Sequence, residues 1–305
     1  MKIKILFSFV VLFAFKANAL PTNRPMPLID PLNTMNPWIL PETFTADYDF
    51  EGIVSLNNCS GSLVRFENSK DSDFAMVLTN GHCIEGKMMA AGAHIAGKKS
   101  KRSFGLLNKT AKKIGTVLAT EIIYGTMTKT DMAIYRLAKT YEQIAALYHL
   151  APLTLSSKPY QSKTSIEIIS GYWQLGYRCE IDGIVHKLKE DKYTWEQSIR
   201  YSLPGCETIH GTSGSPIIEA GKKIVIGVNN TGNDEGKKCT LDNPCEIDEN
   251  GTITYKKGTN YGQQIAWIYD CLDSNNQLDL TLKNCQLPGA QPSFTTQDLA
   301  SLSVQ

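Results

Sequence analysis

Three short segments, far apart along this chain of 305 residues, most constrain how it can fold. They are TNGHC at 79–83, DMAIYRL at 131–137 and HGTSGSP at 210–216. They supply a histidine, an aspartate and a serine framed by glycines, which together can make a base-activated nucleophile. Such a group works only in mutual contact. We therefore expect a fold that brings His82, Asp131 and Ser213 into one cleft.

The first two segments place a base and its partner at strand ends. His82 follows the apolar run at 75–79 and precedes Cys83, so a cross-linked strand end would hold its imidazole, which titrates near neutrality. Asp131 opens an alternating apolar segment, where its carboxylate would accept the second imidazole N–H and fix the tautomer. Taken singly, a surface or core histidine and a turn aspartate are the simpler interpretations.

The third segment predicts an exposed nucleophile. Gly211 and Gly214 flank Ser213, and glycine permits a tight turn. In that turn the N–H groups of Gly211 and Ser213 would converge on a developing oxyanion. A G-x-S-G turn also occurs in linkers, but its place after the other two motifs favours catalysis.

Together the motifs resemble those of the chymotrypsin-like serine peptidases, over roughly residues 50–272. TNGHC is similar to that family's histidine motif, DMAIYRL to its aspartate motif and GTSGSP to its Gly-x-Ser-Gly-Gly-Pro motif, in the same order. Thr212 stands where animal trypsins place the aspartate that receives a freed amine. Ser215 replaces a glycine, as it often does in the secreted bacterial branch that includes glutamyl endopeptidases. The resemblance implies hydrolysis of a peptide or protein substrate without a cofactor.

Short alternating runs separated by polar turns predict an all-β protein. The resemblance implies two packed six-stranded antiparallel barrels with a C-terminal helix, His82 and Asp131 in the first barrel and Ser213 in the second. The expected boundaries are about 50–139 for barrel one, about 152–260 for barrel two and about 261–272 for the closing helix, all within a peptidase domain at 50–272. The segment at about 140–152, which includes the helix-like run YEQIAALYHL at 141–150, would cross between the barrels.

The chain start predicts export. Residues 1–19 combine lysines with a short apolar stretch and an Ala-Asn-Ala ending, which predicts a signal peptide cleaved after Ala19; Lys16 argues against the alternative of a membrane anchor. Residues 20–49 are proline-rich and predict an extended arm or propeptide, and 273–305 a C-terminal extension. We expect the mature protein outside the cytoplasm, secreted or periplasmic, with no membrane partner.

Eight cysteines in an exported chain predict four disulfides. The resemblance pairs Cys59 with Cys83. Hypothetical pairs for the remainder are Cys179 with Cys206, Cys239 with Cys245 and Cys271 with Cys285. Zinc is the alternative, but no paired C-x-x-C is present, and the acidic insertion at 233–258 lacks an EF-hand spacing, so we expect no metal.

The charge balance suggests few other partners. A net charge of +1 favours neither nucleic acid nor an anionic membrane, and we expect a monomer. The basic cluster KKSKR at 98–102 is predicted to be an exposed loop.

Substrate preference rests on the resemblance. Glu207 lies six residues before Ser213, where trypsins have the acidic floor of the specificity pocket, so we expect Arg or Lys at the cleaved bond; an exposed, solvated glutamate is the alternative. The family lines substrate with the backbone of the following strand, which gives as candidate substrate-binding residues Asn229, Asn230 and Gly232. Asn229 stands near the position of the glutamyl branch's substrate-reading histidine, which disfavours a preference for Glu.

Two other functions fit parts of the sequence. An exported, non-catalytic binding protein could retain the double-barrel scaffold and use the cleft or the 233–258 loop for recognition. A serine esterase is the second alternative, but its G-x-S-x-G motif normally precedes the aspartate and histidine, whereas here the serine comes last.

Overall fold

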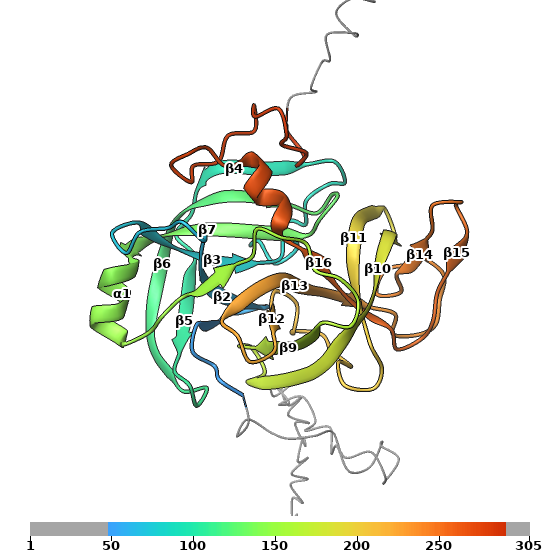
Figure 1. The fold of residues 1–305 in the computed structure, drawn as a ribbon, viewed down its shortest axis with the longest axis horizontal. Coiled ribbons are helices and arrows are strands. Elements are labelled where there is room, and N and C mark those ends of the chain that lie inside the picture. Colours follow the sequence, from blue (N-terminus) through green and yellow to red (C-terminus); the bar gives the residue numbers. More distant parts are fainter. Residues whose placement is uncertain (1–47, 291–305) are drawn as a thin grey trace, which may run out of the picture. The chain divides into compact units, whose positions relative to one another are not determined.

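Residues 48–290 are the part of the chain that the structure, a computed structural model, describes. The expected signal peptide at 1–19, nearly all of the proline-rich segment at 20–49 and residues 291–305 of the expected extension lie outside it. The described residues are all-β, as predicted, with sixteen strands joined in one continuous sheet that closes on itself twice (Figure 1).

The first barrel is a ring of six antiparallel strands. In ring order they are β1 (Ile53–Ser55), β5 (Ser103–Leu107), β6 (Lys113–Thr126), β7 (Met132–Thr140), β3 (Phe74–Thr79) and β2 (Ser60–Arg65), and β2 pairs back to β1. A further strand, β4 (His94–Lys99), pairs with β6 outside the ring. Alternate side chains of a strand face the same side, so Leu63, Val77 and Tyr135 meet in a buried interior.

The second barrel repeats this arrangement. Its ring consists of β9 (Ser165–Ser170), β10 (Leu175–Glu190), β11 (Tyr193–Tyr201), β16 (Asn260–Gln264), β13 (Ile224–Gly232) and β12 (Pro216–Glu219), and β12 pairs back to β9. Ile168, Ile199 and Ile226 are buried inside it. Both six-stranded barrels of the predicted fold class are therefore present.

The connection between the barrels contains the predicted helix. Thr140 begins α1 (Tyr141–Tyr148) with a capping box, in which its side chain accepts from the Gln143 backbone and the Gln143 side chain accepts from the Thr140 backbone. After α1, β8 (Leu153–Leu155) pairs in parallel with both β2 and β13. This short strand joins the sheets of the two barrels.

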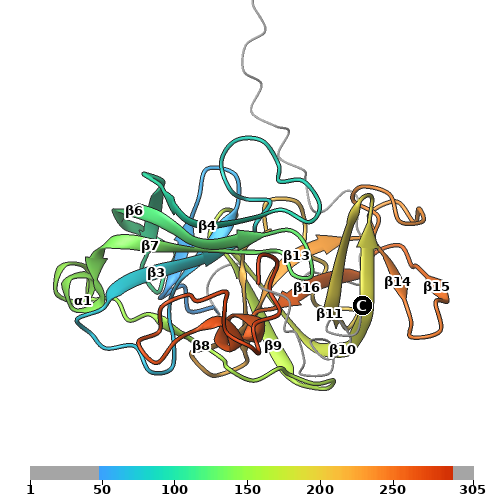
Figure 2. The same ribbon diagram turned by 90° about the horizontal axis from the view of Figure 1, so that it is seen from above.

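A hairpin extends the second barrel outward. It consists of β14 (Cys245–Ile247) and β15 (Ile253–Thr254), with β14 paired to β10, and both views show it beyond β10 (Figures 1 and 2). It belongs to the insertion at 233–258, and the turn between its strands is the ENGT turn at 249–252.

All four expected disulfides form: Cys59–Cys83, Cys179–Cys206, Cys239–Cys245 and Cys271–Cys285. The first ties the start of β2 to the residue after His82. It therefore anchors the segment that carries the candidate base.

The closing segment begins later than predicted. A helix was expected at about 261–272, but Asn260–Gln264 forms β16, and only Ala266–Cys271 is helical, as the 3-10 helix η1. All five residues of β16 are buried, and the strand pairs with β11 on one side and β13 on the other. These long-range pairings override the helical spacing of the apolar residues.

The prediction of an exposed basic loop at 98–102 is wrong for Arg102. Lys98 and Lys99 lie exposed in β4, but Arg102 is only 3% exposed, and its guanidinium donates to the carbonyl of Cys83 and to Asn58. Both Nη groups of the guanidinium donate hydrogen bonds, which offset the cost of its burial, while Nε has no hydrogen-bond partner among the described residues. Arg102 thus supports the segment that contains His82.

Candidate active site

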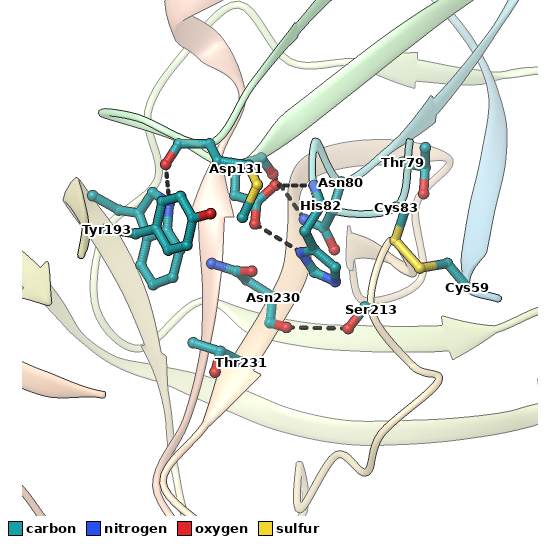
Figure 3. Close-up of polar contacts among 12 residues, drawn as sticks. Cys59, Thr79, Asn80, His82, Cys83, Asp131, Tyr193, Ser213, Asn230 and Thr231 are labelled. Carbon is teal, nitrogen blue, oxygen red and sulfur yellow. Dashed lines mark hydrogen bonds and ion pairs between the residues drawn. A yellow bond between two sulfur atoms is a disulfide. The ribbon is translucent and has the colours of Figure 1, made fainter. Parts of the chain in front are cut away.

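The pairing of β3 with β7 brings the predicted base and carboxylate together. His82 follows β3 and Asp131 precedes β7, and Thr79 is paired with Ala133 between them. Asp131 Oδ2 accepts from His82 Nδ1 at 2.8 Å, and Oδ1 accepts from the His82 backbone N–H at 3.1 Å (Figure 3). Because the carboxylate holds the proton on Nδ1, Nε2 is left as the basic nitrogen.

The surroundings of His82 favour its protonated form. Burial acts to lower the pKa of the imidazole, whereas the charge and hydrogen bond of Asp131 act to raise it, assisted by the more distant charges of Glu190 and Asp242. The net pKa lies above the usual 6.5. An Asp131 side chain that is 1% exposed thus stabilises an imidazolium.

The serine motif forms the predicted turn. Gly211 and Gly214 adopt φ values of +88° and +81°, which disfavour other residues, and a Cβ at Gly214 would lie 2.2 Å from the Ser60 carbonyl oxygen. Within residues 48–290, neither the Gly211 amide nor the Ser213 amide donates a hydrogen bond. Both predicted oxyanion donors are therefore free.

The Gly211 amide has a defined direction. The carbonyl of His210 accepts from Trp173 Nε1 at 2.6 Å. In a trans peptide the C=O and the following N–H point in opposite directions, so the N–H of Gly211 points away from Trp173.

The Ser213 hydroxyl faces the same cavity as the His82 ring. Both line a cavity of about 200 Å³ that also reaches Asp131, Asn230 and Thr231 (Figure 3). Ser213 Oγ donates to the Asn230 carbonyl at 3.3 Å, and no hydrogen bond joins it to His82 in the described part of the chain. Base catalysis requires the hydroxyl to turn to Nε2, and catalytic hydrogen bonds commonly tighten only when substrate is bound.

A series of hydrogen bonds between buried, neutral side chains stabilises the serine turn. Tyr201 OH donates to Asn229 Oδ1 at 3.0 Å, Asn229 Nδ2 donates to Thr212 Oγ1 at 3.1 Å, and Thr212 Oγ1 donates to the carbonyl of Ile209. Tyr201, Asn229 and Thr212 are each at most 2% exposed. The side chain of Asn229, predicted to bind substrate, is thus engaged at both ends within the protein.

Replacing Tyr201 with phenylalanine should leave Asn229 Oδ1 buried without a donor. We expect the free energy of unfolding to fall by about 1–3 kcal/mol. We expect kcat to fall about tenfold while KM changes by less than about twofold, because the turn's amides act mainly in the transition state. Thermal unfolding and peptide kinetics measure both effects. Tyr141→Phe is the control, since Tyr141 OH donates to the Val64 carbonyl in the first barrel; an equal loss of kcat there would contradict this role.

The other predicted substrate-binding residues differ in position. Asn230 and Gly232 line the cavity, whereas Glu207 does not. Glu207 is exposed, and its carboxylate accepts from the Gly205 amide in its own loop at 2.9 Å, as in the solvated alternative. Two neutral side chains, Thr208 and Asn260, line the cavity beside Gly232, and Thr208 Oγ1 donates to Asn260 Oδ1 at 3.1 Å.

Several cavity residues were not predicted from the sequence. They are the carboxylates Glu190 and Asp242 and the aromatic residues Tyr193 and Trp195. Glu190 ends the run HKLKE, which resembles a solvated strand, and Asp242 lies in the insertion. Their place in the cavity is visible only in the structure, where the end of the β10–β11 hairpin is buried.

The sulfurs of Cys59 and Cys83 lie near His82, but their disulfide prevents them from ligating a metal.

Comparison with known proteins assigns this architecture to a family. The family model described as "Trypsin-like peptidase domain" matches residues 59–228, more than half of the chain. The chain belongs to this family. Trypsin-like peptidase domains act on peptides or proteins, and the match includes the His82, Asp131 and Ser213 motifs. A search of curated proteins found no match.

Solved structures similar to this peptidase domain are distant from it in sequence. The MamO protease domain from Magnetospirillum magneticum is 12% identical, with 75% of this chain and 99% of that chain covered and a TM-score of 0.46. The Rv3671c protease from M. tuberculosis is 14% identical, with 81% and 85% covered and a TM-score of 0.43. A Nocardiopsis protease is 16% identical, with 70% and 90% covered and a TM-score of 0.39.

Proposed function

We propose that this protein is an exported serine endopeptidase that hydrolyses peptide bonds through an acyl-enzyme. The observation that carries the proposal is the His82–Asp131 hydrogen bond beside a serine turn whose two amides are free, all facing one cavity. A base with a fixed tautomer, a nucleophile and oxyanion donors are the parts that acyl transfer requires.

In the proposed reaction, Ser213 Oγ attacks the peptide carbonyl while His82 Nε2 takes its proton. Asp131 stabilises the imidazolium, and the amides of Gly211 and Ser213 bind the oxyanion. His82 then gives its proton to the leaving amine, so that the C–N bond breaks and an ester to Ser213 remains. Water, deprotonated by His82, hydrolyses this ester and restores the serine.

The proposed location is outside the cytoplasm. Four disulfides persist in oxidising compartments, and the signal-like start at 1–19 agrees with export. No helix among residues 48–290 is long and apolar enough to cross a membrane. Thr212 and Ser215 support a place in the secreted bacterial branch that includes glutamyl endopeptidases. We further propose that the enzyme acts as a monomer.

The preference for Arg or Lys at the cleaved bond loses its original support. It rested on Glu207, whose carboxylate lies outside the cavity. The neutral pair Thr208 and Asn260 stands beside Gly232 instead. We therefore propose no basic preference through Glu207.

Chemical labelling tests the proposed function. A fluorophosphonate should modify the purified protein, and mass spectrometry should locate the adduct on Ser213. Absence of an adduct under conditions that label a known serine hydrolase would favour a non-catalytic binding protein. Turnover of a simple ester with no cleavage of casein or peptides would favour an esterase.

The activity should fall in acid with a midpoint above that of a free histidine. Only neutral His82 can accept the serine proton, and its pKa is raised above 6.5 by Asp131 despite the opposing effect of burial. We therefore expect kcat/KM to rise with pH, with its half-maximal value above pH 6.5. A profile of kcat/KM between about pH 5 and about pH 9 measures this. A midpoint well below that of a free histidine would contradict the proposed environment.

A further inference from the structure

The catalytic cavity continues beyond the reacting groups to a second set of side chains. Its lining also includes Glu190, Asp242, Tyr193 and Trp195, and Figure 3 shows Tyr193 across Asn230 from Ser213. Neither carboxylate has a role in the proposed acyl transfer. Both lie close enough to raise the pKa of His82.

Glu190 is a buried carboxylate without a cationic partner. It is 5% exposed and accepts two hydrogen bonds, from Thr231 Oγ1 at 2.6 Å and from the Asp242 amide at 3.0 Å. Burial raises its pKa, and the neighbouring charge of Asp242 acts in the same direction. A carboxylate buried in this way is stabilised by a cation, which no Lys or Arg of residues 48–290 supplies.

Asp242 adds a second negative charge at the same place. Its residue is partly buried, and its carboxylate forms no hydrogen bond or ion pair with the described residues. Among the described residues that line the cavity, none is Lys or Arg. The space between the two carboxylates and His82 therefore has a negative potential that favours a positively charged group.

An unpaired donor in the same space indicates what kind of ligand carries that charge. Asn230 is 5% exposed, yet its Nδ2 has no hydrogen-bond partner. Figure 3 shows this amide directed from β13 toward Tyr193. A buried donor requires an acceptor, and a peptide backbone offers a carbonyl at each residue. A bare metal ion would leave Asn230 Nδ2 unsatisfied.

We propose that Glu190 and Asp242 form a subsite that binds an Arg or Lys side chain of the peptide substrate. The inference rests on the proposed function, because it assigns the substrate class of that same site. Met127, Tyr193 and Trp195 also line the cavity, and their apolar atoms there would contact the stem of the side chain. Tyr193 OH and Trp195 Nε1 are bonded to the carbonyls of Met89 and Met127, so neither ring presents an unpaired polar group to that stem.

The test compares cationic side chains with neutral side chains of the same shape. Peptides carrying Arg or citrulline, and Lys or norleucine, at each position flanking the cleaved bond are assayed with the wild-type protein and with Glu190→Gln, Asp242→Asn and the double variant. At one position the wild-type protein should favour the cation by at least about tenfold in kcat/KM. The double variant should reduce that preference to less than about twofold.

Controls separate the subsite from general effects. The preference is scored within each variant as the ratio of kcat/KM for the cationic peptide to that for its neutral counterpart, because removing two charges near His82 also lowers the pKa of the base. Glu235→Gln removes an equal charge from an exposed residue of the same insertion, which pairs with Lys237, and should keep the preference. If the Glu190 variant fails to fold, Asp242→Asn, which breaks no hydrogen bond, should alone reduce the preference at least about threefold.

Three other results would contradict the proposed subsite. Hydrolysis without a cation preference at any position, or a preference that persists in the double variant, would refute it while leaving the proposed function intact. Activity that is lost with EDTA and restored by calcium in the wild-type protein, but not in Glu190→Gln, would assign the carboxylates to a metal ion. Absence of both hydrolysis and fluorophosphonate labelling would refute the proposed function and this inference with it.

Discussion

Replacing Ser213 with alanine should lower kcat for peptide hydrolysis by about 10⁶-fold and abolish fluorophosphonate labelling. The variant loses the only oxygen that can form the acyl-enzyme, although the Gly211 amide and the cavity remain. Fold and disulfides should be unaffected, because Ser213 Oγ makes a single hydrogen bond, to the Asn230 carbonyl. Kinetics on a peptide substrate, together with thermal unfolding of the same preparation, measure the effect.

Ser215→Ala is the matched control for that experiment. It removes the same hydroxyl two residues away, and Ser215 Oγ is buried without a hydrogen-bond partner. Deleting an unsatisfied hydroxyl should leave stability equal or slightly higher and kcat within about threefold of the wild-type value. If Ser213→Ala retained activity comparable with that of Ser215→Ala, Ser213 would not be the nucleophile.

The fold was largely predictable because its signals are local. Alternating runs such as 61–66 and 75–79 became β2 and β3, and the helix-like run at 141–150 became α1. Strands with one buried face repeat every two residues, so single segments reveal them. The segment 260–264 was not predicted as a strand, because its strand structure depends on pairing with β11 and β13.

The three motif residues could be predicted because each lies at a strand end or in a glycine turn. Their motifs specify residue type, local backbone and order together. Their flanking apolar runs predict the two strands, and the pairing of β3 with β7 in the structure brings Asp131 and His82 together. The direction of the Ser213 hydroxyl, which donates to the Asn230 carbonyl, depends on a contact that no one segment encodes.

The substrate side of the cavity could not be predicted in this way. Counting residues placed Glu207 at the floor of a pocket, but the direction of its loop turned the carboxylate to solvent. Glu190 receives its hydrogen bonds from Thr231 and from Asp242, 41 and 52 residues away. From the sequence alone, Glu190 at the end of a lysine-rich strand is expected to be solvated, and only these contacts show that it is buried. This part of the cavity therefore depends on contacts between segments far apart in the sequence, whereas the predicted reacting groups lie in local motifs.

The Asp131 carboxylate fixes which ring nitrogen of His82 is basic. One of its oxygens accepts from the His82 backbone N–H at 3.1 Å and the other from Nδ1 at 2.8 Å. An asparagine in its place has one acceptor and one donor. If its oxygen keeps the backbone hydrogen bond, its NH₂ group faces Nδ1, which must then accept and leave the ring proton on Nε2.

Asp131→Asn should therefore lower kcat by about 10⁴-fold near neutral pH, because Nε2 bearing a proton cannot take the proton of Ser213. The loss arises in proton transfer, so KM should change by less than about threefold. Asp182→Asn, which removes the same charge beside Arg200 outside the catalytic cavity, should leave kcat unchanged. Steady-state kinetics would test the rate, and a proton NMR spectrum of the His82 ring would test the tautomer. A proton still bound to Nδ1 in Asp131→Asn, with kcat reduced less than about tenfold, would show that Asp131 does not orient the base.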